Sequence, residues 1–139
     1  MRDRLSVLAA ALWWGSLSVM GFVAVPLLFA HLPSAALAGN TAARLFAAQG
    51  WVSLGCGLCL LLLLKSQVLG AGVDRRERAR NTLLLVLVAM LLVLLLEYAV
   101  APRIVARHNL RLWHGLGSLL YVLQWLGAGA VLWRLSRRD

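Results

Sequence analysis

The chain has 139 residues, of which 62% are hydrophobic, with a mean hydropathy of +0.83 and a formal net charge of +9. Four apolar runs fill most of this length, so the composition excludes a soluble domain with a core of its own beside them. The basic residues flank the runs and do not gather on one soluble face. The charge therefore reflects membrane topology, and we expect no nucleic-acid partner.

The apolar runs predict four membrane-spanning helices, at about 5–29, 43–64, 82–100 and 112–133. Each has roughly the ~20 residues that a helix needs to cross the hydrocarbon layer. Unpaired backbone amides are costly in lipid, and a helix pairs them within one segment. Because the connections are short, we expect an all-α fold with one transmembrane domain over residues 1–139. Its helices should form an antiparallel, up-down four-helix bundle.

The distribution of Lys and Arg predicts the orientation of this bundle. Ten basic residues precede the first run, join the second to the third or follow the fourth, whereas four lie on the other side. The side richer in positive charge faces the cytoplasm. We therefore expect a multi-pass protein of the bacterial inner membrane with both termini in the cytoplasm. The first run is longer than the ~7–15 apolar residues of a signal peptide, so we expect it to be retained as a helix.

The first helix and the segment after it contain the first breaks in the apolar pattern. Pro26 lacks a backbone N–H and predicts a kink near the outer end of this helix. In the segment 31–39, Ser34 can cap one or two helical turns and Gly39 can end them. We expect this segment to lie on the outer surface of the membrane.

The second helix carries a thin polar track and two cysteines. Gln49, Ser53 and Cys56 share a face by their i, i+4, i+7 spacing. Cys56 and Cys59 lie one turn apart, and a pair of thiolates can bind a soft metal such as Cu(I). No second thiol pair or neighbouring histidine in the sequence completes a four-ligand site. We therefore expect both cysteines to be small packing residues, reduced and free of metal.

A charged segment separates the last two helices from the first two. We expect residues 65–81 to form a cytoplasmic loop and Pro102 to end the third helix. The fourth helix has a polar stripe, which we expect to face the interior as a packed seam or as the wall of a ligand cavity. Its residues are His114, Ser118, Tyr121 and Trp125, with Gln124 beside them. Gln124 lies near mid-membrane and needs a hydrogen-bond partner on the first or second helix.

Ionisable side chains gather at the outer ends of the predicted helices. This outer polar cluster consists of His31, Arg44, Glu97, Arg103, His114 and Ser118. An ionisable residue inside a membrane span indicates a functional site by default, and Glu97 lies one to two turns inside the outer boundary. We expect Glu97 to contact Arg44 or Arg103, with His114 hydrogen-bonded beside them. The cluster is then either a structural ion pair or a binding site.

Three blocks of sequence, in this order, resemble a known family. The blocks are Pro26-Leu27-Leu28-Phe29 through Leu32-Pro33 and Ala38-Gly39 to Arg44-Leu45-Phe46, then Ala101-Pro102-Arg103, then Trp113-His114-Gly115-Leu116-Gly117-Ser118. Together they resemble the transmembrane protein 205-like family. The resemblance implies a four-helix integral membrane protein with no established catalytic activity. It also implies that the family positions are Pro26, Phe29, Arg44, Phe46, Pro102, Arg103, His114, Gly115 and Ser118. The chain departs from the family pattern at Gly117, where Ser is expected, and at Ala101, where some members carry Glu.

These observations favour a non-enzymatic membrane protein that acts as an accessory, scaffold or assembly subunit. Its expected partners are the lipid bilayer and either another membrane protein or a second copy of the chain. The alternative is a binding or transport protein that takes a metal, haem or small anion through the outer polar cluster. A membrane oxidoreductase using quinone or haem is a third hypothesis. Paired-carboxylate catalysis is excluded, because Glu97 is the only acidic residue within the predicted spans. The favoured hypothesis needs no cofactor, and only the alternatives call for haem or copper.

Overall fold

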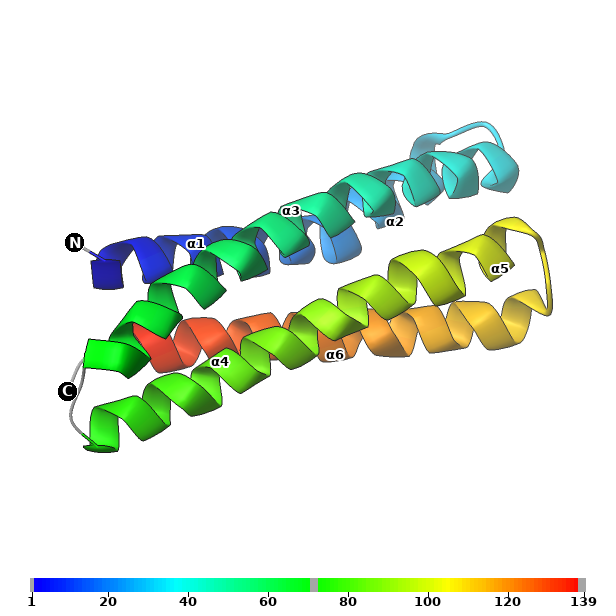
Figure 1. Cartoon of the computed structure of the whole chain (residues 1–139). Coiled ribbons are helices and arrows are strands. Elements are labelled where there is room, and N and C mark those ends of the chain that lie inside the picture. The colour runs from blue at the N-terminus through cyan, green and yellow to red at the C-terminus, as the bar shows by residue number, and fades with distance from the viewer. Residues whose placement is uncertain (1, 71–72, 138–139) are drawn as a thin grey trace.

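The computed structural model describes residues 2–70 and 73–137, and nearly all of them are helical (Figure 1). No strand occurs within these residues, which confirms the all-α prediction. The elements in chain order, with η for a π-helical segment, are α1 (Arg2–Val19), η1 (Met20–Ala24), α2 (Val25–His31), α3 (Ala35–Gly70), α4 (Val73–Leu94), η2 (Leu95–Val100), α5 (Ala101–Val105) and α6 (Leu110–Ser136).

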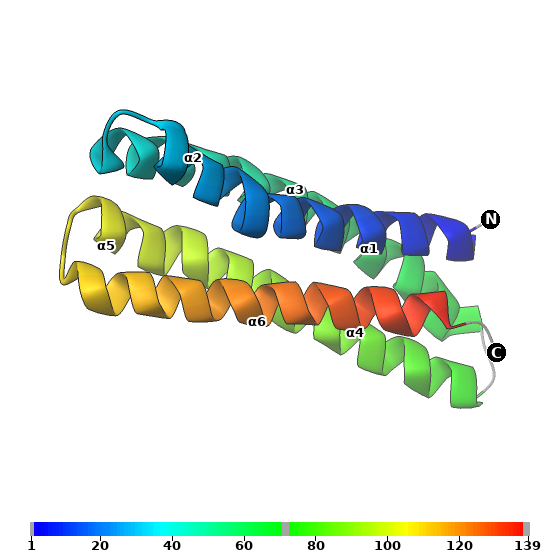
Figure 2. The same cartoon turned by 180° about the vertical axis from the view of Figure 1, so that it is seen from behind.

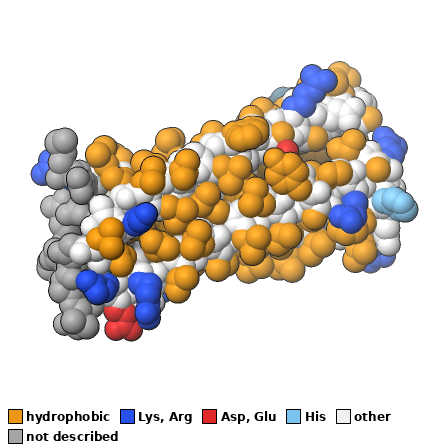
Figure 3. All heavy atoms as spheres, in the orientation of Figure 1, with side chains coloured by type: hydrophobic (Ala, Val, Ile, Leu, Met, Phe, Trp, Pro, Cys, Tyr) orange, Lys and Arg blue, Asp and Glu red, His pale blue; other side chains and the backbone are white. Residues whose placement is uncertain are grey.

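Four continuous helical rods are long and apolar enough to cross a membrane, as the sequence predicts. They extend over Arg4–His31, Ala35–Ser66, Arg76–Val105 and Leu110–Ser136. Large apolar side chains such as Leu8, Leu62 and Trp51 are exposed along the rods, and Figure 3 shows this apolar surface on one face of the molecule. An exterior of this kind is suited to lipid, because lipid tails solvate leucine as well as a protein core does.

The rods are arranged in a ring in which each packs against two others, in the cyclic order α1, α3, α4, α6. Figures 1 and 2 show that α1 begins and α6 ends at one end of the molecule, which we call the proximal end. The links 32–34 and 106–109 lie at the other end, which we call the distal end.

The proximal half of the bundle axis is filled by a packed apolar core. Its fully buried side chains include Trp13, Leu17, Leu60, Val86 and Val131, and no equivalent set of large buried side chains occupies the described distal half. The difference leaves room between the rods in the distal half.

The segment 31–39 differs from the prediction in one respect. Ser34 does cap a helix, because its Oγ accepts a hydrogen bond from the backbone N–H of Leu37 at 3.2 Å. However, Gly39 does not end the helix, and α3 continues from Ala35 without interruption. A glycine inside a helix costs only about 1 kcal/mol. Breaking the helix beside a membrane would leave several backbone groups unpaired, which costs more.

The expected loop over residues 65–81 is also largely helical. α3 continues to Gly70 and α4 begins at Val73, which leaves residues 71–72 outside the described part of the chain. The charged segment contains Arg, Glu and Ala, which are strong helix formers in water as well as in lipid. Charge therefore marks where the apolar run ends and does not mark where the helix ends.

Both π-helical segments end two residues before a proline, at Pro26 and at Pro102. A proline ring presses against the carbonyl four residues earlier, here that of Phe22 in η1 or Tyr98 in η2. The wider π turn gives each ring the space it needs. The prediction that Pro102 ends the third helix is therefore wrong, since the chain remains helical to Val105.

Candidate functional site

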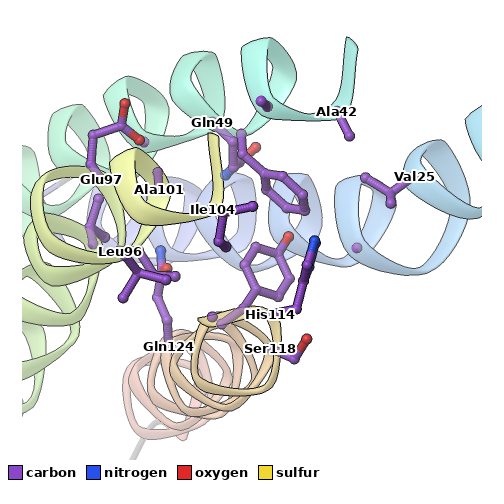
Figure 4. Close-up of a pocket in the computed structure, with 18 of the residues that line it drawn as sticks. Val25, Ala42, Gln49, Leu96, Glu97, Ala101, Ile104, His114, Ser118 and Gln124 are labelled. Carbon is purple, nitrogen blue, oxygen red and sulfur yellow. The ribbon is translucent and has the colours of Figure 1, made fainter. Parts of the chain in front are cut away.

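A cavity of about 500 Å³ lies between the four rods in the distal half of the bundle (Figure 4). It exists because each rod contributes a small residue to the wall, where a larger side chain would fill the space. These small residues are Gly21, Ala42, Gly50, Ala101 and Gly117. Both π-helical segments also border the cavity, through Gly21 and Phe22 on one side and Leu96, Glu97 and Val100 on the other. Such segments occur frequently at functional sites.

The wall of the cavity is mainly apolar and carries a few polar groups. Its aromatic and large aliphatic side chains include Phe22, Phe29, Phe46, Leu96 and Ile104. Its polar side chains are Gln49, Ser53, Glu97, His114, Ser118, Tyr121 and Gln124. Figure 4 shows Glu97 on the side next to α3, with His114 and Gln124 extending from α6. A mainly apolar wall with few polar groups is typical of sites for small molecules.

Three buried polar side chains form the proximal floor of the cavity. Gln124 Nε2 donates to Ser53 Oγ at 3.1 Å, and Gln49 Nε2 lies 3.4 Å from the same oxygen. Gln49 Nε2 also donates to Ser16 Oγ at 2.9 Å. The partner expected for Gln124 on the first or second helix is therefore Ser53 on α3. One hydroxyl thus joins the two amides and closes the cavity against the packed core below.

Tyr121 is held in a fixed position on the α6 side of the cavity. Its hydroxyl donates to the backbone carbonyl of Leu17 at 2.7 Å. The Phe46 ring meets it edge-on, with ring centroids 5.3 Å apart. Gly21 lies so close that a Cβ built on it would be 2.6 Å from Tyr121 Cε1. The ring can approach η1 this closely only because Gly21 has no side chain.

Glu97 belongs to η2 and lies in the part of the cavity wall next to α3. Its Oε2 would be 3.6 Å from a Cβ built on Gly50, so the carboxylate packs over that glycine. The predicted ion pair with Arg44 or Arg103 is not formed, although the structure describes all three residues. Arg103 instead donates a hydrogen bond to the backbone carbonyl of Ala99, four residues earlier in the same rod. Its guanidinium also lies over the Trp113 ring, 4.6 Å from the ring centroid.

The outer polar cluster is therefore divided in the structure. Glu97, His114 and Ser118 line the cavity, whereas His31, Arg44 and Arg103 are exposed and do not line it. His31 Nδ1 lies 3.1 Å from the carbonyl of Leu27 on its own helix. The long basic side chains reach solvent more readily than the interior, which explains why the predicted corner of four charged groups does not assemble.

The two cysteines have different environments and neither is paired in a disulfide. Cys56 is buried in the proximal core and Cys59 is exposed on the outer face. Among the described residues, no three His, Cys, Asp or Glu side chains are grouped so that they could hold a metal ion. Neither cysteine lines the cavity.

The sequence reasoning missed several residues of the cavity, although a spacing pattern indicates them. Ala42, Phe46 and Gln49 on α3 have the same spacing as Gly117, Tyr121 and Gln124 on α6, namely small-x3-aromatic-x2-Gln. An aromatic residue also stands four positions before each proline within a rod, at Phe22 and at Tyr98. The aromatic and amide residues of both triplets line the one cavity. The repeated spacing could have predicted that these two helices face a common space.

The fold and the cavity define a class: small all-helical proteins with four spans of the kind found in membranes. Within it, this chain belongs to the family described as a domain of unknown function (DUF4149), whose match covers residues 8–112. The match includes Glu97 and the first two of the three sequence blocks but ends before His114. No curated protein and no solved structure matches the chain.

Proposed function

We propose that the protein is a non-enzymatic membrane protein that binds a small, mostly apolar molecule in the cavity between the distal halves of its rods. The observation that carries this proposal is the cavity itself. Its volume of about 500 Å³ falls within the range of ~300–1,000 Å³ typical of small-molecule sites. Its wall combines apolar surface with a few polar side chains, and Tyr121 and Gln124 are held by hydrogen bonds before any ligand arrives.

The residues of the wall support a ligand other than the small anion or metal ion considered from the sequence. None of the described residues that line the cavity is Lys or Arg, which a buried anion would need. A single histidine, His114, lines it, and metal sites use several ligands. Glu97 is the only carboxylate in the described lining, and no hydrogen bond joins Ser118 to His114, so neither a carboxylate pair nor a paired nucleophile and base for hydrolysis is assembled there.

The role of accessory, scaffold or assembly subunit ranks second. The sequence supported this role mainly through an apolar exterior that a protein partner could contact. Contact with lipid alone requires such an exterior, so the surface does not favour a protein partner or a second copy over the bilayer. We also propose a relationship to the transmembrane protein 205-like family, on the three sequence blocks described above.

For the membrane arrangement, we propose an antiparallel, up-down bundle in the bacterial inner membrane, with both termini in the cytoplasm. The ten-to-four division of basic residues supports this orientation. A reporter fused after residue 139 and a second inserted in the 106–109 link should then report opposite sides of the membrane. Activity of a periplasm-dependent reporter at the C-terminus would reverse the proposed orientation.

The binding proposal is tested by filling the cavity with a larger side chain and measuring whether a small molecule still copurifies with the protein. Ala42 is buried and lines the cavity, so Ala42→Phe should occupy part of its volume. Ala48 is exposed on the same helix and does not line the cavity, which makes Ala48→Phe the matched control. Native mass spectrometry in a mild detergent should show a bound small molecule on the wild type and on Ala48→Phe, and little or none on Ala42→Phe. Equal occupancy of all three proteins, or no bound molecule on any of them, would overturn the proposal.

A further inference from the structure

We infer that Glu97, Trp51 and Tyr98 form a lateral entrance that binds the ammonium group of an amphiphile whose apolar part occupies the cavity. This inference rests on the proposed function and names the class of ligand. In the structure, a carboxylate in the cavity wall lies next to two exposed aromatic side chains immediately outside the cavity.

At Glu97 the cavity borders a second hollow on the outside of the bundle. A small groove of about 90 Å³ lies on the outer face of the bundle between α3 and the α4–η2 rod. Three residues, Gly50, Val93 and Glu97, line both this groove and the main cavity. A Cβ built on Gly50 would lie 3.6 Å from Glu97 Oε2 and 3.8 Å from Val93 Cγ1, so the Glu97 carboxylate and the Val93 side chain stand together between the two spaces. Figure 3 shows an acidic side chain at a hollow in an otherwise apolar face.

Glu97 is the only acidic residue among the described residues that line the cavity. A carboxylate surrounded by apolar residues is costly unless a cation or hydrogen-bond donors compensate it. Arg103 is engaged with Ala99 and Trp113, and Arg44 forms no ion pair with Glu97. No Lys or Arg among the described residues forms an ion pair with Glu97, so a ligand cation would complete the site.

Trp51 and Tyr98 line the groove beside Glu97 and are 71% and 68% exposed. The faces of tryptophan and tyrosine attract ammonium groups, quaternary ones included. A carboxylate flanked by two such rings therefore recognises an organic cation better than a neutral polar group or a hydrated metal ion.

The direction of the entrance determines the rest of the ligand. The groove opens between two rods on the apolar exterior, so a molecule enters from the lipid and not from water. The apolar cavity behind Glu97 then receives a hydrocarbon part. An alkyl chain with an ammonium head has this chemistry, and it occurs both in amine-bearing lipid headgroups and in free lipophilic amines.

The test compares two probes that differ in charge alone: tritium-labelled decyltrimethylammonium and its neutral analogue, in which carbon replaces the nitrogen. Binding is measured to the full chain in a neutral maltoside detergent. We expect saturable binding of the cation, at least about tenfold tighter than that of the neutral analogue, which is the effect of one partly desolvated ion pair with cation–π contacts beside it. Glu97→Gln should abolish the difference, and Trp51→Leu should weaken binding of the cation by about two- to fivefold.

Two control variants separate the local effect of Glu97 from the total charge. Glu77→Gln removes the same charge from an exposed residue near the proximal end of α4 and should leave binding unchanged. Arg44, seven residues before Trp51, lies on the same face of α3. Arg44→Gln should leave binding of the cation equal or tighter, because no ion pair with Glu97 is lost.

Competition then distinguishes the two sources of the ligand. Displacement of the probe by short-chain phosphatidylethanolamine, but not by phosphatidylglycerol with the same chains, upholds the inference with a lipid headgroup as occupant. Displacement by neither lipid upholds it with a free lipophilic amine. Equal displacement by both lipids, equal affinity for the two probes, or no effect of Glu97→Gln would overturn the inference while leaving the cavity proposal intact. If neither probe binds, the inference falls, and native mass spectrometry of Ala42→Phe decides separately whether the cavity proposal also falls.

Discussion

Gly21→Ala is expected to lower the free energy of unfolding by ~1–3 kcal/mol, the usual cost of overpacking. The new methyl group would lie 2.6 Å from Tyr121 Cε1 and 3.3 Å from its Cζ. The Tyr121 ring has little freedom to move away, because its hydroxyl is bonded to Leu17 and Phe46 packs against its edge. Unfolding in a detergent titration, followed by circular dichroism, measures the effect.

Alanine substitutions at two other glycines in the rods serve as controls, and each should lower the free energy of unfolding by less than Gly21→Ala. A Cβ on Gly15 would meet nothing within 4 Å, so Gly15→Ala should be neutral or stabilising by up to about 1 kcal/mol. A Cβ on Gly57 would lie 2.6 Å from Met90 Cγ and Sδ, but the flexible Met90 side chain can move aside, so Gly57→Ala should cost less than Gly21→Ala. If Gly21→Ala proves as stable as Gly15→Ala, the Tyr121 ring is not fixed against α1.

Ser53→Ala is expected to destabilise the protein by ~1–3 kcal/mol, because it removes the acceptor that Gln124 uses and leaves a buried amide unpaired. Gln49 should be affected less, since it also donates to Ser16. Adding Gln124→Leu to Ser53→Ala should recover much of the loss, because the apolar replacement removes the unpaired donor. The same unfolding titration, applied to both single variants and the double variant, measures the coupling.

Ser136→Ala is the matched control for the loss of a serine hydroxyl. Ser136 is exposed and bonds only to the carbonyl of Trp133 on its own helix at 3.0 Å, so its removal should change stability by less than about 0.5 kcal/mol. Additive effects of Ser53→Ala and Gln124→Leu would show that the two side chains do not share a bond.

Much of the fold follows from the apolar pattern, and the limits of that pattern explain the errors. Apolar runs locate the membrane-crossing part of each helix, which is why the four spans were predictable. They do not locate helix ends, because residues such as those in the segment 73–80 continue a helix after the apolar run has ended. The effect of Pro102 was wrongly predicted for a related reason: a π turn can absorb a proline that a regular helix cannot.

The candidate site was less predictable, because it depends on the rotation of each helix about its own axis. Helical spacing places His114, Ser118 and Tyr121 on one face, and all three line the cavity. The same reasoning could not show whether a charged side chain at a helix end turns inward or outward. Glu97 lines the cavity, whereas Arg44 and Arg103, at similar depth, are exposed. A long side chain can satisfy its charge in several directions, and the sequence does not choose among them.

The repeated spacing on α3 and α6 affects how an elongated molecule would lie in the cavity. The two sides offer nearly the same frame, with Phe46 and Gln49 on one and Tyr121 and Gln124 on the other. A frame of this kind alone would hold a rod-shaped molecule equally well in either of two orientations. The two π-helical segments that border the cavity differ from each other, since Gly21 of η1 stands five residues before Pro26 and Glu97 of η2 stands five residues before Pro102. Of these two segments only η2 carries a charged side chain, that of Glu97, so a ligand with unlike ends has one preferred orientation.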